Sequence, residues 1–252
     1  MIPSDYSGED ISRRLDPRAK LLVTIALIFS LVLLPKDSFP VYGLYLLLII
    51  TFILLSHLLL IPVLKRSLVV MPFVLLVAVF LPFVSEGEVI FQRDLGFIMI
   101  EVTDMGLGTF IGVLLKSWLS VLALSWLVMS TGFINLVKGL EGLKVPRLFT
   151  TLLLFIYRYI FVIFDESVRL RQAMESRSFG SLWLRVKATG SILGVLFIRS
   201  YERGERVYQA MLARGYDGQL KGLKSNEFGL ADTCFVSFSL VGIALVSLVS
   251  LL

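Results

Sequence analysis

Residues 199–218 read RSYERGERVYQAMLARGYDG, a polar, arginine-rich helix pattern in a chain that is otherwise mostly apolar. A similar pattern, DESVRLRQAMESRSFG, occupies residues 165–180. Sliding one stretch onto the other aligns Asp165 with Glu202, Arg169 with Arg206, Gln172-Ala173-Met174 with Gln209-Ala210-Met211, and Arg177 with Arg214. The shared pattern predicts two similar helix ends, each carrying one arginine between small residues.

An arginine in the last turn of a helix interacts favourably with the negative end of the helix dipole. The Gly or Ser that follows can take the conformation that ends a helix, and it lets a partner approach closely. Guanidinium also pairs bidentately with a carboxylate. Arg177 and Arg214 are therefore predicted to bind two similar sockets on a partner. The alternative is that two amphipathic helices on a membrane surface happen to resemble each other.

The composition is that of a polytopic membrane protein, because 57% of the 252 residues are hydrophobic and only 17% are charged. One cysteine, Cys234, and one histidine, His57, exclude an intrachain disulfide and a metal site built on several Cys or His ligands. Residues 135–228 contain 15 Lys/Arg and 8 Asp/Glu, so this block has a net charge of +7. The rest of the chain has a net charge of −2, which gives +5 for the whole chain. Such a block can bind anionic lipid or an acidic protein surface. Binding to nucleic acid is disfavoured, because acidic side chains alternate with the basic side chains at helical spacing.

Hydropathy predicts an all-α protein with about five spans, at residues 19–34, 41–61, 67–84, 107–133 and 229–252. Residues 62–67 are expected to be a short basic connection and residues 85–104 an acidic loop. Lys116 is expected to extend outward from the fourth span. The positive-inside rule places the N-terminus and residues 135–228 in the cytoplasm. The predicted organisation is a four-span part (1–134), a cytoplasmic block (135–228) and a last span (229–252).

Residues 148–164 are apolar enough to span, but they contain Arg158 and are followed by Arg169 and Arg171. The next apolar stretch, residues 191–198, is too short to return the chain, so the whole block is expected to lie along the membrane surface. The sequence has no nucleophile beside a base, no GxxxxGK[ST] or GxGxxG pattern, and no carboxylate within the four clear spans before the block. These absences argue against an enzyme, an ATPase and a proton-driven carrier, and they favour a coupling subunit without a cofactor.

Three stretches resemble the transmembrane (T) component of energy-coupling factor (ECF) transporters, in the CbiQ branch associated with cobalt uptake. They are LDPRAKL at residues 15–21, VPR at 145–147 and, most specifically, RGERVYQAMLARGY at 203–216. The resemblance implies a multi-pass plasma-membrane subunit that ties a pair of cytoplasmic ABC-type ATPases to a separate, CbiM-like membrane subunit that captures substrate. In that family, two x-Arg-x motifs at the ends of coupling helices dock into the ATPases.

Carried onto this chain, the docking motifs are Ser176-Arg177-Ser178 and Ala213-Arg214-Gly215, where Ser176 departs from the alanine that the family usually shows. Supporting residues on the coupling helices are Arg169, Glu202, Arg203, Arg206 and Gln209. Cobalt is the favoured cargo, with nickel or a vitamin as alternatives, and the partner subunit would hold a metal. Two other functions stay open at this point: a membrane-surface scaffold whose basic block binds anionic lipid, and a membrane enzyme.

Overall fold

The computed structural model describes residues 15–35, 39–84, 89–94, 99–176, 182–217 and 229–249. The chain divides into two compact units, one made of Met1–Gly139 with Asn226–Leu252 and the other of Leu140–Ser225. Each unit is described by itself. The predicted all-α class is confirmed, with one small β-hairpin as an addition.

The first unit contains most of the apolar helices. They are α2 (Pro17–Leu33), α3 (Phe39–Leu55), α4 (Leu60–Leu68), α5 (Met71–Ala78), α6 (Leu81–Val84), α7 (Asp104–Thr131) and α11 (Leu230–Val249), and α8 (Phe133–Gly142) begins here. The hairpin of β1 (Val89–Asp94) and β2 (Met99–Thr103) lies in the predicted acidic loop. Four described stretches are long and apolar enough to cross a membrane, namely Leu60–Ala78, Asp104–Thr131, Arg147–Glu175 and Leu230–Val249, and Pro40–Leu55 is a shorter apolar helix.

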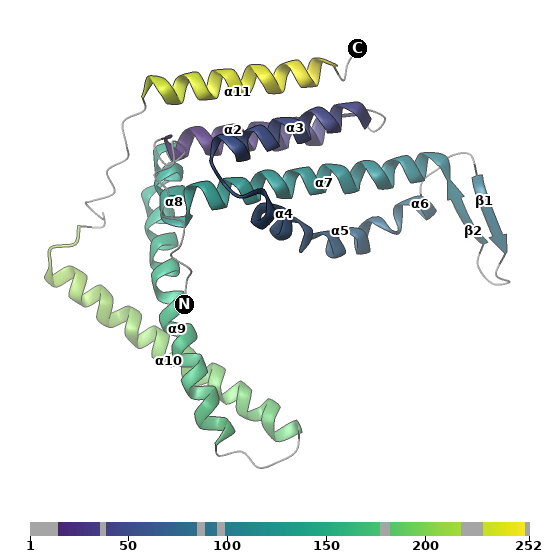
Figure 1. Cartoon of the computed structure of the whole chain (residues 1–252). Helices are drawn as coiled ribbons and strands as arrows, with labels where there is room; N and C mark the ends of the chain where they lie inside the picture. The colour runs from purple at the N-terminus through teal and green to yellow at the C-terminus, as the bar shows by residue number, and fades with distance from the viewer. Residues whose placement is uncertain are drawn as a thin grey trace. The chain divides into compact units, whose positions relative to one another are not determined.

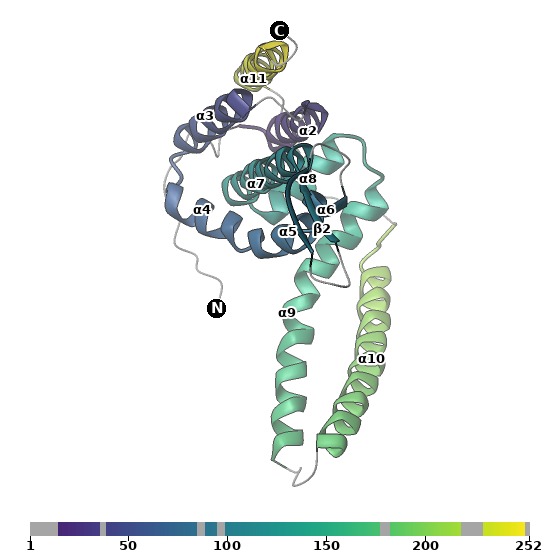
Figure 2. The same cartoon turned by 90° about the vertical axis from the view of Figure 1, so that its right-hand side faces the viewer.

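Helix α7 is the centre of this unit, and helices α2 to α6 pack around it (Figure 2). Its inward face buries Leu119, Leu122 and Trp126. The outward faces of the surrounding helices are apolar as well, with Phe29 66% and Phe238 79% exposed. Such exposed apolar faces are expected where the solvent is lipid, so the packing agrees with a multi-pass membrane protein.

Two indole groups of α7 fix it to neighbouring segments through hydrogen bonds, of which that of Trp126 is buried. Trp126 Nε1 donates to Ser56 Oγ at 2.8 Å, and Trp118 Nε1 donates to Ser67 Oγ at 3.2 Å. Ser56 lies in the turn after α3, and Ser67 lies near the end of α4. These hydrogen bonds hold the end of α3 and the end of α4 against defined positions on α7.

The third span differs from its prediction. The basic connection expected at residues 62–67 is wrong, because α4 runs through it, and the apolar stretch begins at Leu60 rather than at residue 67. Pro62 falls in the first turn of α4, where a missing N–H costs nothing. Pro72 and Pro82 each lie at the second position of a new helical segment, α5 and α6, and the two residues before α5, Val69 and Val70, keep right-handed helical backbone angles.

Helices α2 and α7 run antiparallel, and each contributes a lysine to the end of the other. Lys20, in the first turn of α2, donates from Nζ to the Ser130 carbonyl at 3.3 Å. Lys116 of α7 donates to the Leu34 carbonyl at 2.6 Å. Both lysines therefore satisfy carbonyls at helix C-termini and complement the helix dipoles. The Lys116 charge lies at the level of the end of α2, which explains how an apolar helix tolerates it.

Helices α2 and α11 run parallel, with their N-termini together. Asp16 is the N-cap of α2, where its side chain accepts the Arg18 N–H and Pro17 occupies the first helical position. The Asp16 N–H in turn donates to Asp232 Oδ1, in the first turn of α11, at 2.7 Å. The two helices therefore start on the same side of the bundle, and the LDPRAKL stretch forms this shared start.

The second unit is a pair of long helices, α9 (Arg147–Glu175) and α10 (Leu182–Ala213), which cross each other (Figure 1). Pro146 of the VPR stretch is the N-cap of α9. One stripe of α10 is shielded from solvent at helical spacing, while the positions between are exposed. The stripe consists of Ala188, Ile192, Leu196, Ser200, Arg203, Val207 and Met211.

Candidate docking site on the long helix pair

The end of α10 is a Schellman motif with Gly215 as its left-handed residue. Gly215 has φ +76°, its N–H donates to the Leu212 carbonyl at 2.9 Å, and the Tyr216 N–H donates to the Met211 carbonyl at 3.0 Å. Both bonds are those that end a helix sharply, and glycine takes this conformation without the cost that a Cβ brings. The sequence predicts this geometry for the glycine of the Ala213-Arg214-Gly215 motif.

Arg214 is presented to solvent at this helix end. Its side chain is exposed, and within the described residues it forms no ion pair, whereas Arg169, Arg171, Arg199 and Arg206 are all paired. Ala213 and Gly215 on either side of it are exposed too, and neither has a side chain large enough to cover it. The guanidinium is therefore free to bind a carboxylate or a carbonyl of another protein.

The other predicted motif begins where α9 ends. Ser176 is the C-cap of α9, with its N–H donating to the Gln172 carbonyl at 3.0 Å and its Oγ donating to the same carbonyl at 2.9 Å. Arg177 and Ser178 lie outside the described residues. Their role stays a prediction from the sequence.

The end of α9 at Ser176 and the end of α10 at Ala213 are far apart. A helix of 32 residues is roughly 48 Å long. Residues 177–181 join Ser176 to Leu182, and six extended steps of chain span at most about 21 Å. Ser176 and Ala213 are therefore at least about 27 Å apart.

Three of the predicted supporting residues, Glu202, Arg203 and Arg206, line a pocket between α9 and α10. Glu202 and Arg206 form an i,i+4 ion pair of 3.8 Å there, and Gln209 is exposed. The internal repeat aligns Asp165-Arg169 with Glu202-Arg206, but Arg169 bonds Glu166 at 3.2 Å instead. Glu166 faces α10 and also pairs with Arg199, so it gathers both arginines at the crossing.

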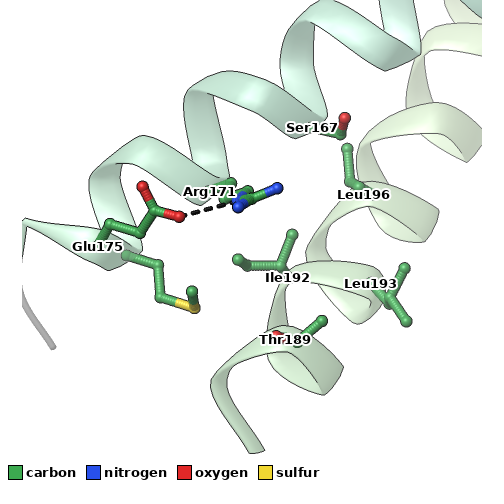
Figure 3. Close-up of a pocket in the computed structure, with 8 residues that line it drawn as sticks. Ser167, Arg171, Glu175, Thr189, Ile192, Leu193 and Leu196 are labelled. Atoms are coloured by element: carbon green, nitrogen blue, oxygen red, sulfur yellow. Dashed lines mark hydrogen bonds and ion pairs between the residues drawn. The ribbon is translucent and has the colours of Figure 1, made fainter. Parts of the chain in front are cut away.

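A cavity of about 630 Å³ lies between the last turns of α9 and the first half of α10 (Figure 3). One wall carries the ion pair between Arg171 Nε and Glu175 Oε1, at 2.8 Å, and the facing wall carries Ile192 and Leu196. Its shape follows from two straight helices that diverge from their crossing point. The described residues that line this cavity do not include a set of catalytic side chains that point toward one another.

Two charged groups of these units were not predicted from the sequence. The interhelical pair Glu166–Arg199 joins residues 33 positions apart, and no local spacing indicates it. Asp232 could have been noticed, because it is an acid three residues after Gly229 at the start of an otherwise apolar span.

The comparisons with known proteins agree with this architecture. A family model, CbiQ, described as cobalt transport protein, matches residues 8–225. An uncharacterised protein of Methanocaldococcus jannaschii is 30% identical over 199 residues, which cover 77% of this chain and 68% of that protein. The energy-coupling factor transporter transmembrane protein EcfT of Bacillus subtilis is 28% identical over 223 residues, covering 84% and 82%. A putative fused cobalt transport protein, CbiMQ, of Methanocorpusculum labreanum is 30% identical over 143 residues, covering 56% of this chain and 24% of the fused protein.

Proposed function

Since the chain belongs to the CbiQ family and is similar over most of its length to an energy-coupling factor transporter transmembrane protein, we propose that it is the energy-coupling subunit of an ATP-driven importer. It would be a non-catalytic subunit that joins a pair of ABC-type ATPases to a substrate-capturing membrane subunit. ATP-driven closure of the ATPases would move the two sockets relative to each other. The α9–α10 pair would pass this motion to the membrane helices.

The observation that carries this proposal is the Arg214 helix end. An exposed guanidinium without an ion-pair partner among the described residues, on a backbone held by the turn at left-handed Gly215, is an accessible group at a defined helix end. Because this backbone is already ordered, docking orders only the side chain. The equivalent role of Ser176-Arg177-Ser178 rests on the repeat in the sequence. The separation of at least about 27 Å between the two motifs favours two ATPase subunits over one.

The parallel start of α2 and α11 supports the proposed topology. The chain must cross the membrane an even number of times between these two starts, and α2, α3, the α4–α6 segment and α7 supply four crossings. Within the second unit, helix α9 is long and apolar enough to span the membrane. If it crossed, the number of crossings between the starts of α2 and α11 would be five, which is odd. We therefore place α9 and α10 along the cytoplasmic face of the plasma membrane, together with the N-terminus.

Cobalt is the proposed cargo, because the matching family is described as cobalt transport protein and one relative is a fused CbiMQ. The single His57 and single Cys234 cannot build a cobalt site, since this metal prefers several imidazole, thiolate or carboxylate ligands. A CbiM-like partner would hold the ion. Nickel and a vitamin are the alternative cargoes, because the coupling subunit does not choose the substrate.

The test is a detergent pull-down of the tagged chain from its native host. Wild type is compared with the double variant Arg177→Glu, Arg214→Glu, and the matched control is Lys187→Glu, an exposed charge reversal on α10. An ABC-type ATPase that copurifies with wild type and the control, and is lost from the double variant, supports the proposal. An ATPase that binds all three equally, or none that binds wild type, refutes it.

A charge-conserving pair of variants separates docking from lipid binding. Arg177→Lys and Arg214→Lys keep the attraction to anionic lipid but lose bidentate pairing. We expect uptake to fall much more for either variant than for changes at Arg185 or Lys187. Equal losses at all four positions would favour the membrane-surface scaffold.

A further inference from the structure

Three segments that are far apart in the sequence meet around buried charges at the start of α2. Asp16, Lys20 and Asp232 are 2%, 1% and 5% exposed. Asp232 Oδ1 accepts the Asp16 N–H at 2.7 Å, and Asp232 Oδ2 accepts the Gly229 N–H at 3.0 Å. The Asp232 carboxylate therefore bonds to both the first and the last helix of the unit.

Lys20 extends the cluster to the end of α7 and supplies the opposite charge. Its Nζ donates to the Ser130 carbonyl at 3.3 Å, and its ammonium interacts electrostatically with Asp232. Asp16 Oδ2 is buried without a hydrogen-bond partner among the described residues. Arg18 Nε lies 3.9 Å from Asp16 Oδ1, so removing the Lys20 charge would leave the buried Asp232 carboxylate without a cation, which is far costlier than an intact pair.

Helix α8 packs against the same point. A Cβ on Gly139 would lie 2.8 Å from Leu21 Cδ1 and 3.1 Å from Pro17 Cβ, which is closer than side chains normally approach. Val137, in the same helix, is 1% exposed. The start of α2, the end of α7, the middle of α8 and the start of α11 therefore form one tightly packed junction, defined here by Asp16, Lys20, Ser130, Gly139 and Asp232.

The junction lies where the chain leaves the first unit and where it returns. The second unit begins at Leu140, one residue after Gly139, and ends at Ser225, four residues before Gly229. Both covalent connections to α9 and α10 thus end at this junction. A displacement of the long helices that travels along the chain reaches the membrane helices at this point first.

We propose that this junction is the anchor that converts movement of α9 and α10 into a coordinated movement of the membrane helices. Asp16, Lys20 and Asp232 are its positioning residues. The proposal rests on the coupling role proposed above. With the junction intact, α2, α7 and α11 are pulled together, and with it broken, the connections give way locally and ATP hydrolysis runs without transport.

The test uses the complete complex, with its ATPases and its substrate-capturing subunit, reconstituted in proteoliposomes. The variants are Lys20→Met, Asp232→Asn and the double variant. Trp118→Phe is the matched control, because it also removes an interhelical hydrogen bond of the first unit, to Ser67, and lies twelve residues before Ser130 in α7. The readouts are ATPase copurification, ATP hydrolysis and substrate taken up per ATP hydrolysed.

We expect both single variants to retain the ATPases and to hydrolyse ATP, while uptake per ATP falls at least about fivefold because a buried charge loses its partner. The double variant should recover part of the loss, because it removes both charges together. Gly139→Ala, which perturbs the junction without changing charge, should reduce uptake per ATP in the same way. It also provides the test if a single charge variant does not fold.

Wild-type uptake per ATP in the junction variants would overturn the proposal, and so would an equal fall in Trp118→Phe. A loss of uptake that merely follows a loss of bound ATPase would also overturn it, because the junction would then be needed only for folding or assembly. If wild type itself binds no ATPase, the coupling function fails first, and the anchor proposal fails with it. The two failures are therefore distinguishable in one experiment.

Discussion

Replacing Gly215 by alanine tests whether the shape of the α10 end matters for ATPase binding, and not only the charge of Arg214. Gly215 has φ +76°, and an added Cβ would meet no atom within 4 Å, so the cost of alanine is purely conformational. An L-residue in the left-handed region costs about 1 kcal/mol or slightly more. If the docked state requires the Schellman turn, this cost weakens binding by about fivefold.

The matched control is Gly204→Ala in the same helix. Gly204 lies inside α10, and its added Cβ would also meet no atom within 4 Å. Alanine there favours the helix by up to about 1 kcal/mol, so binding should stay equal or improve. The assay is equilibrium binding of the purified ATPase pair to the chain in detergent. Wild-type affinity in Gly215→Ala, or equal weakening in both variants, would refute the reasoning.

Three further predictions concern the first unit and are measured by thermal unfolding in detergent. His57→Gly should stabilise by about 1 kcal/mol, because His57 holds the left-handed position after α3 at φ +49°, and a lower Tm would contradict this. Trp126→Phe should destabilise by about 1–3 kcal/mol, because the buried Ser56 hydroxyl loses its donor, and Ser56→Ala in the same background should then cost little more; an unchanged Tm in Trp126→Phe would show that the bond is not needed. Lys116→Met should cost about 1–3 kcal/mol by leaving the Leu34 carbonyl without its ammonium, whereas a more stable variant would mean that desolvating this half-buried ammonium costs more than its hydrogen bond contributes.

The parts of the fold that follow from local pattern were predictable. Apolar runs gave the membrane helices, and small residues beside Arg214 indicated a sharp helix end, which Gly215 forms. The third span was predicted to begin at residue 67 rather than at Leu60, because Lys65 and Arg66 resemble a polar connection between spans. In the structure they occupy the last turn of α4, where basic side chains complement the helix dipole.

The parts that depend on long-range contacts were not predictable from one sequence. Asp16 and Asp232 are 216 positions apart, and their bond follows from the packing of α2 against α11. Glu166 pairs with Arg169 at the local i,i+3 spacing, but no local signal selects Arg199, 33 positions along the chain, as its second partner. The helix ends of the docking motifs could be found from sequence because capping is a local property, while the charges that organise each unit could not.

The single uninterrupted run of α10 also fixes a rotational phase. Each residue of an α-helix advances the chain by about 1.5 Å and turns it by about 100°. Inserting one residue between Leu196, which packs toward α9, and Arg214 would turn the guanidinium by more than a quarter of a circle while moving it only slightly along the axis. Length changes in α10 are therefore compatible with docking only in steps close to whole turns, such as seven residues for two turns, and other changes in length must fall outside the helix.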